Sequence, residues 1–358
     1  MLIKYNNLPY LQTLIQTRPQ LERYLKTINN DSSLAIDTEF KRINTYYPEL
    51  CLVQIATTQF AECIDVLSIN DLEPLFEKLY HNKTEWIVHS ARQDIEALYH
   101  LSKRIPVSLF DTQIAASLLN YPLQISYQAL TEILQDVLLD KSYTRFDWTT
   151  RPLPANVVEY ALDDVRYLLP NFEKLKHELT ISKKIQWLDE ETRFLLDQEL
   201  YKPSIEQICY KTKGLSKLGK KFQDKAIKLV TWREKSAQQK NKPRKWIMSD
   251  QKLLDYACGK SKLSTRSQKL FDDFVKESSV NLTLSELLTP QKPLTSSEKN
   301  KKNELQRIIN SLAESYNLPP EVISTSKSLK KFIRGDLSAP LFSGWRAKLF
   351  NKEKLNAK

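Results

Sequence analysis

The order of strand-like and helix-like segments is the feature that most narrows what this chain can fold into. Apolar and polar residues alternate over 34–40, which predicts a strand, and two further strands are expected at 50–56 and 60–66. Short apolar runs at 86–89 and 107–110 then each precede a stretch with helical periodicity. Three successive strands followed by alternating strands and helices predict an α/β domain with a mixed sheet flanked by helices.

The distribution of charge divides the chain near residue 201. Residues 1–200 hold 20 Lys and Arg against 28 Asp and Glu, whereas residues 201–358 hold 34 against 15. Apolar residues in the basic half follow helical spacing, and a Pro- and Ser-rich stretch at 289–297 marks a second break. We therefore predict three domains, an α/β domain and two small all-α domains, at residues 1–202, 203–290 and 291–358.

The basic second half favours a nucleic-acid partner, because Lys and Arg that neutralise phosphates supply much of the affinity for such polyanions. A cluster of lysines just after the predicted boundary is our candidate for this contact, and its members are Lys211, Lys213, Lys217, Lys220 and Lys221. A solvated, Lys-rich surface that only keeps the protein in solution would give the same net charge of +11. Charge alone leaves both interpretations open.

Composition argues against several classes of protein. The four cysteines lie far apart without a CxxC pair, and no histidines have the HExxH spacing, so a disulfide scaffold or a structural zinc site is not expected. No apolar run is long enough to cross a bilayer and the mean hydropathy is −0.47, so neither a membrane span nor a secretory signal is expected. We expect a cytoplasmic protein, and a monomer, because no coiled-coil heptad pattern appears.

Two acidic residues share one face of the first predicted strand. Asp37 and Glu39 are two positions apart, so both carboxylates leave the same side of a sheet. Two such charges about 4 Å apart repel each other by about 4 kcal/mol at an effective dielectric constant near 20. A divalent cation with oxygen ligands would neutralise them. Alternatively, Glu39 forms an ion pair with Lys41 or Arg42 at the end of the strand.

Further acids stand where a site could form. Tyr160 and Asp164 are four residues apart in a predicted helix and therefore share one face, on which Asp164 occupies a position where an apolar residue is expected. Asp94 follows a buried strand, and strand ends are where α/β folds gather their sites. Each acid taken alone could equally be a helix cap or a surface charge.

Three motifs carry a resemblance to a known family. The segments "DTEF" at 37–40, "HSARQDI" at 89–95 and "YALDDVRYLLP" at 160–170 resemble the three exonuclease motifs of ribonuclease D. The segments "DTQIAA" at 111–116 and "LDKSYTRFDWTTRPL" at 139–153 are also typical of that family. Ribonuclease D is a 3′-to-5′ exonuclease of the DEDD type, so the resemblance implies a ribonuclease H-like fold for the first domain.

The basic half resembles the HRDC modules of the same enzymes. The segment "KPRKWIMSDQKLLDYA" at 242–257 matches the first module well. The segments at 318–335 and 344–350 match the second module more loosely. The resemblance thus implies a ribonuclease H-like α/β exonuclease domain followed by two small all-α HRDC-type domains.

The resemblance also implies a set of site residues. The family's four metal-binding acids correspond to Asp37, Glu39, Asp94 and Asp164, which would hold two Mg²⁺ or Mn²⁺ ions, and Tyr160 places the chain in the tyrosine subclass. We expect Tyr160 to orient the attacking water, although a purely structural hydroxyl is the alternative. His89 and Asp94 happen to match the spacing of the histidine subclass's third motif, but they lie in the second motif, so we reject that assignment.

Residues expected to bind the substrate are less strongly implied. Phe40 and His89 are candidates for stacking on or hydrogen bonding to the terminal nucleotides. Arg145 and Arg151 flank Trp148 and are candidates for binding phosphates, although either could be an ordinary surface arginine.

The expected function is that of ribonuclease D. We predict a hydrolase that removes nucleotides from the 3′ ends of tRNA precursors and other structured RNAs and releases nucleoside 5′-monophosphates. The alternatives are a DNA 3′-5′ exonuclease, because the same metal site serves DNA, and a catalytically inactive RNA-binding scaffold. The scaffold would be expected to lack one or more of the acids, and all four are present.

Overall fold

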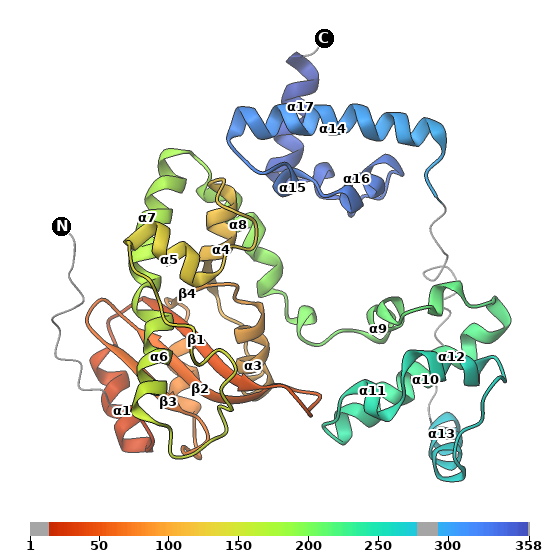
Figure 1. Cartoon of the computed structure of the whole chain (residues 1–358), viewed down its shortest axis with the longest axis horizontal. Coiled ribbons are helices and arrows are strands. Elements are labelled where there is room, and N and C mark those ends of the chain that lie inside the picture. The colour runs from red at the N-terminus through yellow and green to blue at the C-terminus, as the bar shows by residue number, and fades with distance from the viewer. Residues whose placement is uncertain (1–13, 278–292, 357–358) are drawn as a thin grey trace. The chain divides into compact units, whose positions relative to one another are not determined.

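The structure, a computed structural model, describes residues 14–277 and 293–356, which pack as two compact units (Figure 1). Unit 1 consists of the described parts of residues 1–41, 50–197 and 294–358. Unit 2 consists of residues 42–49 and the described part of residues 198–293. The predicted division into three domains stays a prediction, and its boundary after residue 290 lies outside the described residues.

A five-stranded mixed sheet forms the centre of unit 1. The strands are β1 (Ser33–Lys41), β2 (Glu49–Ala56), β3 (Ala61–Asp65), β4 (Glu85–Val88) and β5 (Ser108–Asp111). Their order in the sheet is β3-β2-β1-β4-β5. β2 pairs with β3 in antiparallel fashion, whereas β1 and β4, and likewise β4 and β5, run parallel. The predicted mixed sheet is confirmed, and each strand begins and ends within two residues of its expected position.

Helices cover both faces of this sheet. They are α1 (Arg18–Thr27), α2 (Glu73–Leu79), α3 (Arg92–Ser102), α4 (Thr112–Leu118), α5 (Tyr127–Gln135), α6 (Ala155–Arg166), α7 (Leu168–Ile181) and α8 (Ile185–Thr192). Phe110 of β5 packs edge to face on Phe172 of α7, with ring centroids 4.7 Å apart. On the other face, the indole of Trp86 in β4 donates a hydrogen bond of 2.7 Å to the carbonyl of Leu79 in α2. Phe110 and Trp86 thus pack against helices on opposite faces of the sheet, because side chains alternate between the two faces along a strand.

The C-terminal segment of unit 1 is helical, as predicted. It contains α14 (Ser296–Tyr316), α15 (Pro320–Ile323), α16 (Ser326–Ile333) and α17 (Gly344–Asn356). Its contact with α8 rests on an aromatic pair, because Trp345 stacks on Trp187 with centroids 4.4 Å apart and planes 9° apart. The Trp345 indole also donates a hydrogen bond of 2.8 Å to Glu191, which forms an ion pair with Arg346.

Unit 2 is a small helical unit. Its helices are α9 (Ile205–Lys211), α10 (Lys220–Gln239), α11 (Arg244–Ile247), α12 (Asp250–Ala257) and α13 (Thr265–Glu277). Trp232, Tyr256 and Phe271 lie together in its core. The buried carboxylate of Glu234 forms an ion pair with Arg244 and accepts a hydrogen bond from the Tyr46 hydroxyl, which ties the segment 42–49 to α10.

Short 3₁₀ helices occur between these elements, at Arg193–Leu196, Gln198–Leu200, Leu215–Lys217 and Pro340–Phe342. Among the helices that the structure describes, every one is too short or too polar to cross a bilayer.

Candidate active site

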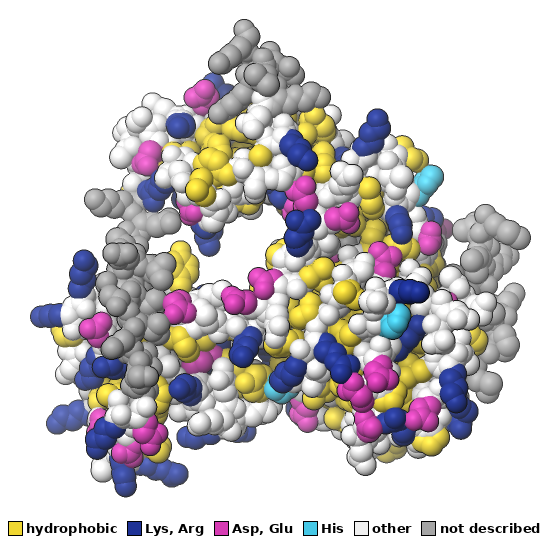
Figure 2. Space-filling view, turned by 180° about the vertical axis from the view of Figure 1, so that it is seen from behind, with side chains coloured by type: hydrophobic (Ala, Val, Ile, Leu, Met, Phe, Trp, Pro, Cys, Tyr) yellow, Lys and Arg dark blue, Asp and Glu magenta, His cyan; other side chains and the backbone are white. Residues whose placement is uncertain are grey.

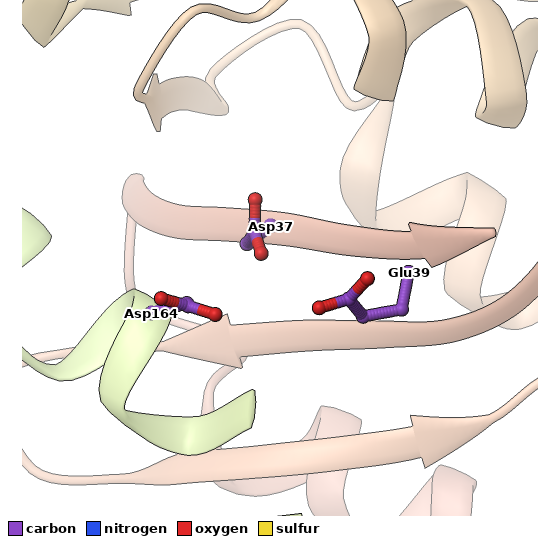
Figure 3. Close-up of side chains that lie close together, drawn as sticks. All are labelled: Asp37, Glu39 and Asp164. Atoms are coloured by element: carbon purple, nitrogen blue, oxygen red, sulfur yellow. The ribbon is translucent and has the colours of Figure 1, made fainter. Parts of the chain in front are cut away.

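Three of the four predicted acids meet on one face of the sheet. Asp37 and Glu39 leave the same side of β1, and α6 packs over this side and carries Asp164. Ligand atoms of these three residues lie within 4.8 Å of one another. Figure 3 shows the three carboxyl groups gathered between β1 and the helix. Residues far apart in the sequence therefore supply oxygen atoms to one small volume, which is the geometry that a hard divalent cation needs.

The fourth acid, Asp94, lies close by but not within that group of three. It stands in the first turn of α3, which follows the carboxyl end of β4 and packs against β1. The Thr38 hydroxyl donates a hydrogen bond of 2.6 Å to Asp94 Oδ1. Only 6% of the Asp94 surface is exposed, and its negative charge acts on Asp37, Glu39 and Asp164. Thr38 therefore fixes Asp94 beside the cluster.

Burial raises the pKa values of all four acids, and repulsion within the cluster adds to this for Asp37, Glu39 and Asp164. Burial raises the pKa of Asp37 well above its usual value, and the charges of Asp94, Asp164 and Glu39 add to this effect. For the same reasons the pKa of Glu39 is raised to about 9. Burial also raises the pKa of Asp94 and of Asp164 to about 7 each. The cluster thus holds protons near neutral pH, and a divalent cation would favour the ionised form.

The position of Asp164 depends on a break between two helices. α6 ends at Arg166 and α7 begins at Leu168. The Tyr127 hydroxyl donates to the Asp163 carbonyl (3.0 Å) and accepts from the Tyr167 N–H (3.2 Å), two groups that would bond each other in a continuous helix. Pro170 reinforces the break, because it lacks an N–H and its ring conflicts with continued helix geometry. Asp164 consequently lies in the last turn of α6.

Tyr160 lies one helical turn before Asp164. Its ring is enclosed by aromatic residues of the 139–153 segment, with Tyr143 edge-on at 5.6 Å and Trp148 at 6.4 Å between centroids. Burial raises the pKa of Tyr160, and so do the charges of Asp164, Glu39 and Asp37, whereas a hydrogen bond with the Thr144 side chain opposes the rise. The phenol therefore keeps its proton at neutral pH and can orient a water molecule but is a poor base.

The predicted nucleotide-binding residues differ in how much of their surface is available. Phe40 is half-buried near the end of β1, and Arg145 is exposed. His89 is half-buried, and both of its ring nitrogens are within 2.9 Å of protein atoms, namely Thr112 Oγ1 and the Ile125 carbonyl oxygen. A hydrogen bond from His89 to a nucleotide would therefore require one of these contacts to break. Their role in binding stays a prediction.

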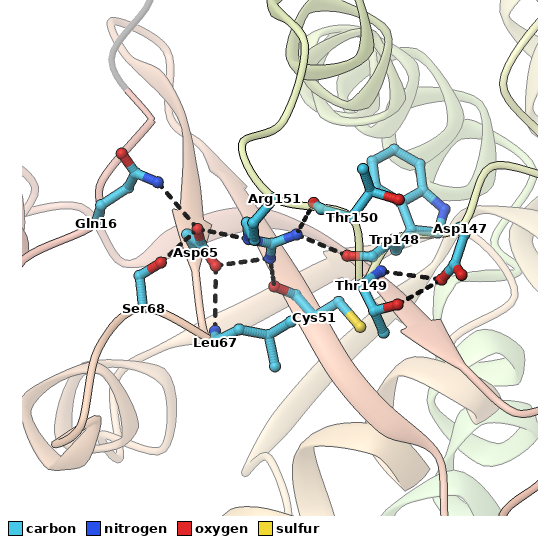
Figure 4. A network of polar contacts seen from close by, with 10 residues as sticks. All are labelled: Gln16, Cys51, Asp65, Leu67, Ser68, Asp147, Trp148, Thr149, Thr150 and Arg151. Atoms are coloured by element: carbon cyan, nitrogen blue, oxygen red, sulfur yellow. Dashed lines mark hydrogen bonds and ion pairs between the residues drawn. The ribbon is translucent and has the colours of Figure 1, made fainter.

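Arg151 is not available for phosphate. Its guanidinium group makes five hydrogen bonds, all to protein acceptors, at 2.7–3.1 Å (Figure 4). A guanidinium group has five N–H donors, so none is left for a substrate. The prediction that Arg151 binds phosphates is therefore wrong for this geometry. The sequence could not show this, because the partner Asp65 lies 86 residues earlier in the chain.

The predicted lysine cluster belongs to unit 2. Lys211 ends α9, Lys217 ends the short 3₁₀ helix, and Lys220 and Lys221 begin α10. All five lysines, including Lys213, are exposed. Figure 2 shows Lys and Arg side chains spread over the surface of this unit, at the left of the view. Their contact with a nucleic acid stays a prediction.

Sequence reasoning missed three residues that hold the site in place. Thr38 fixes Asp94, Tyr127 holds the helix break beside Asp164, and Thr144 contacts the Tyr160 hydroxyl. The contact of Thr38 could have been predicted in part. Thr38 lies between the two acids of β1, so its side chain leaves the opposite face of the sheet and must find a partner there. The sequence gives no signal for Tyr127 or Thr144, since their partners lie 16 to 40 residues away.

Comparisons with known proteins show which family this chain is related to. Residues 12–180 match a family model described as 3′-5′ exonuclease. Ribonuclease D of Bartonella henselae is 33% identical, over 96% of this chain and 89% of the relative. Ribonuclease D of Desulfotalea psychrophila is 32% identical, over 90% of this chain and 91% of the relative. The crystal structure of Escherichia coli RNase D is similar in fold, with a TM-score of 0.82 and 24% identity over 96% of this chain and 98% of that one.

Proposed function

Because this chain belongs to the ribonuclease D family, we propose that Asp37, Glu39, Asp94 and Asp164 are the ligands of its catalytic metal ions. The chain is a hydrolytic 3′-5′ exoribonuclease whose exonuclease domain depends on divalent metal. We further propose that this site holds two ions and that they are Mg²⁺ or Mn²⁺. When bound, such ions supply Lewis acidity for the hydrolysis of a phosphodiester and neutralise charge on the phosphate.

The observation that carries this proposal is the close approach of three half-buried acids. Oxygen atoms of Asp37, Glu39 and Asp164 lie within 4.8 Å of one another, and their pKa values are raised. Such an arrangement costs free energy unless protons or a metal neutralise it. All donors are carboxylate oxygens, which suit Mg²⁺ and Mn²⁺ better than softer metals. Four carboxylates would balance the charge of two divalent ions.

Tyr160 is the residue that we assign to water orientation. Its hydroxyl keeps its proton at neutral pH and is set beside Asp164 on the same helix face. A hydroxyl of this kind can donate one hydrogen bond and accept another, so it can fix the direction from which a water approaches the phosphorus atom. Products would be nucleoside 5′-monophosphates, released one at a time from the 3′ end.

For the substrate, we propose 3′ ends of tRNA precursors and other structured RNAs. The relatives are named ribonuclease D, and the Escherichia coli protein is described as an exoribonuclease involved in structured RNA processing. The exposed lysines of unit 2 support this proposal, because an acidic catalytic half attracts a polyanion only weakly by itself. We propose that the two helical segments are HRDC-type modules that bind RNA. We expect the protein to act in the cytoplasm as a monomer.

One assay tests the proposal. A 5′-labelled tRNA precursor with a 3′ extension and a single-stranded DNA are each incubated with the purified protein, with Mg²⁺ and with chelator. We expect shortening of the RNA from its 3′ end, loss of this activity with chelator, and slower attack on DNA. Asp164→Asn should reduce the rate by at least about 100-fold, the upper end of what losing a supporting residue around a metal costs, while RNA binding persists.

The matched control is the neighbouring acid Asp163. It forms an ion pair with Arg166 at 2.8 Å and lies outside the group of three. Asp163→Asn should therefore leave the rate within a few-fold of the unchanged protein. Equal rates for the Asp164→Asn protein and the unchanged protein, or full activity in chelator, would overturn the assignment of the site.

A further inference from the structure

An ion pair between a buried carboxylate and a half-buried arginine holds one end of the segment that encloses Tyr160. The side chain of Asp65, at the end of β3, is fully buried, and it binds Arg151 in bidentate fashion through bonds of 2.7 Å and 2.8 Å (Figure 4). Asp65 also accepts hydrogen bonds from Ser68 Oγ (2.8 Å), Gln16 Nε2 (3.1 Å) and the Leu67 N–H (3.1 Å). The lone pairs of the Asp65 carboxylate are thus occupied by the protein, which is what makes a buried charge tolerable.

The remaining donors of Arg151 bind the backbone of the same segment and of the sheet. They reach the carbonyls of Trp148 (2.8 Å) and Thr150 (2.7 Å), and that of Cys51 in β2 (3.1 Å). One guanidinium group therefore joins β2, β3 and the chain around Trp148. The segment 139–153 contains no helix or strand. These bonds therefore take the place of the backbone hydrogen bonds that regular secondary structure would supply.

The segment held in this way forms the surroundings of Tyr160. Trp148, whose carbonyl binds Arg151, lies against the Tyr160 ring, and Phe146 packs edge-on against Trp148 at 5.3 Å. Tyr143 closes another side of the ring, and the Thr144 side chain contacts the phenol hydroxyl. A shift of the segment would therefore change the direction of the Tyr160 hydroxyl without removing any residue that touches substrate.

We propose that Asp65 and Arg151 are positioning residues for hydrolysis, which set the Tyr160 hydroxyl through the backbone of residues 148–151. This inference rests on the proposed role of Tyr160 in orienting water. Arg151 needs its planar fork for this task, because it bridges two carboxylate oxygens and three carbonyls at once. A lysine offers three donors from one point and cannot reproduce that arrangement, so Lys is not a conservative substitute here.

A double-mutant cycle on the full chain tests the proposal. Arg151→Lys, Tyr160→Phe and the double variant are assayed on a 3′-extended RNA at saturating Mg²⁺. We expect Arg151→Lys to lower kcat by about 10-fold or more, up to the roughly 100-fold that a misplacement of about 1 Å can cost, with KM for RNA changed less than threefold. In the Tyr160→Phe background the same substitution should lower kcat by less than threefold, because the group on which it acts is already gone.

Two outcomes overturn the inference. One is an equal loss of kcat from Arg151→Lys in both backgrounds, and the other is an unchanged kcat in the single variant. Arg104→Lys is the matched control, since Arg104 pairs with Glu73 at an exposed site and its substitution should leave kcat unchanged. Failure of the proposed function is distinguishable, because the unchanged protein would then lack chelator-sensitive activity or would be insensitive to Tyr160→Phe.

A second variant covers the case in which Arg151→Lys does not fold. Thr144 is exposed and lies in the same segment, 139–153, where its side chain contacts Tyr160. Thr144→Val removes its hydroxyl without burying a charge, and should lower kcat several-fold with KM for RNA unchanged. An unchanged kcat in Thr144→Val would overturn the proposal that this segment sets Tyr160.

Discussion

The hydroxyl of Thr38 donates a hydrogen bond of 2.6 Å to the buried carboxylate of Asp94 and so joins the first strand to α3. Thr38 stands between Asp37 and Glu39 in the sequence, and the strand period sends its side chain to the opposite face. One stretch of three residues thus supplies two acids to the cluster directly and holds the fourth acid of the proposed site from behind.

This relationship predicts a specific effect of Thr38→Val, which keeps the shape of the side chain but removes the hydroxyl. Asp94 would lose its side-chain donor and be held only by backbone N–H groups. We therefore expect activity at limiting Mg²⁺ to fall by about 10- to 100-fold, as for other residues that orient a metal ligand. Titration of activity with Mg²⁺ measures the change. Thr38→Ser, which keeps the hydroxyl, should stay within a few-fold of the unchanged protein, and an equal loss in both variants would contradict this role.

The raised pKa values predict how pH and metal act on stability. Asp94 and Asp164 have a pKa of about 7 in the folded chain, above the value near 3.9 of an unfolded aspartate. Their stabilising contribution is therefore complete below about pH 4 and is lost as the pH rises through about 7. Mg²⁺ binds the ionised carboxylates, so its addition should raise Tm by several degrees at pH 8 and much less at pH 5.5.

Thermal unfolding with and without Mg²⁺ at the two pH values checks this expectation. Asp164→Asn serves as the control, because it removes one titrating group and one proposed ligand together. Its Tm should depend less on pH and respond less to Mg²⁺. The same Mg²⁺-induced rise in Tm at pH 5.5 and pH 8 would show that the acids do not bind the metal in competition with protons.

The fold and the acids could be predicted from local sequence patterns, whereas the residues that hold the site in place could not. Asp37 and Glu39 follow from the period of a strand, and the spacing of Tyr160 and Asp164 follows from the period of a helix. The role of Arg151 could not be predicted in this way, because its nearest sequence neighbours suggest an exposed arginine beside Trp148. Its partner Asp65 lies on another strand, and only the sheet topology brings the two together.

The exposed lysines of unit 2 predict a strong salt dependence of RNA binding. Each phosphate contact in a single strand contributes about 0.7 to the slope of log K against log salt concentration. Replacing the five lysines of the predicted cluster by Gln should therefore reduce the slope by about 2–3.5 if three to five of them touch phosphates. Binding of a labelled, 3′-extended RNA to the catalytically inactive Asp164→Asn protein at several salt concentrations measures it.

The control for this prediction uses exposed lysines of the acidic half. Lys26→Gln and Lys83→Gln remove positive charge from unit 1 and should leave the slope nearly unchanged. If the five-lysine variant keeps the slope of the unchanged protein, the basic charge of unit 2 serves another purpose, such as keeping the protein in solution.

The stacked pair of Trp187 and Trp345 predicts how the C-terminal helical segment is held on α8. Trp345 is 2% exposed and adds a hydrogen bond to Glu191, so Trp345→Ala should cost about 3–5 kcal/mol of local stability, the usual range for a buried tryptophan. We expect residues 294–356 to become sensitive to limited proteolysis while the sheet stays protected, because the sheet has its own core. Trp246→Ala is the matched control, since Trp246 is 61% exposed and its loss should leave the protease pattern unchanged. Equal protease resistance of Trp345→Ala and the unchanged protein would mean that other contacts, such as the ion pair of Arg346 with Glu191, suffice to hold the segment.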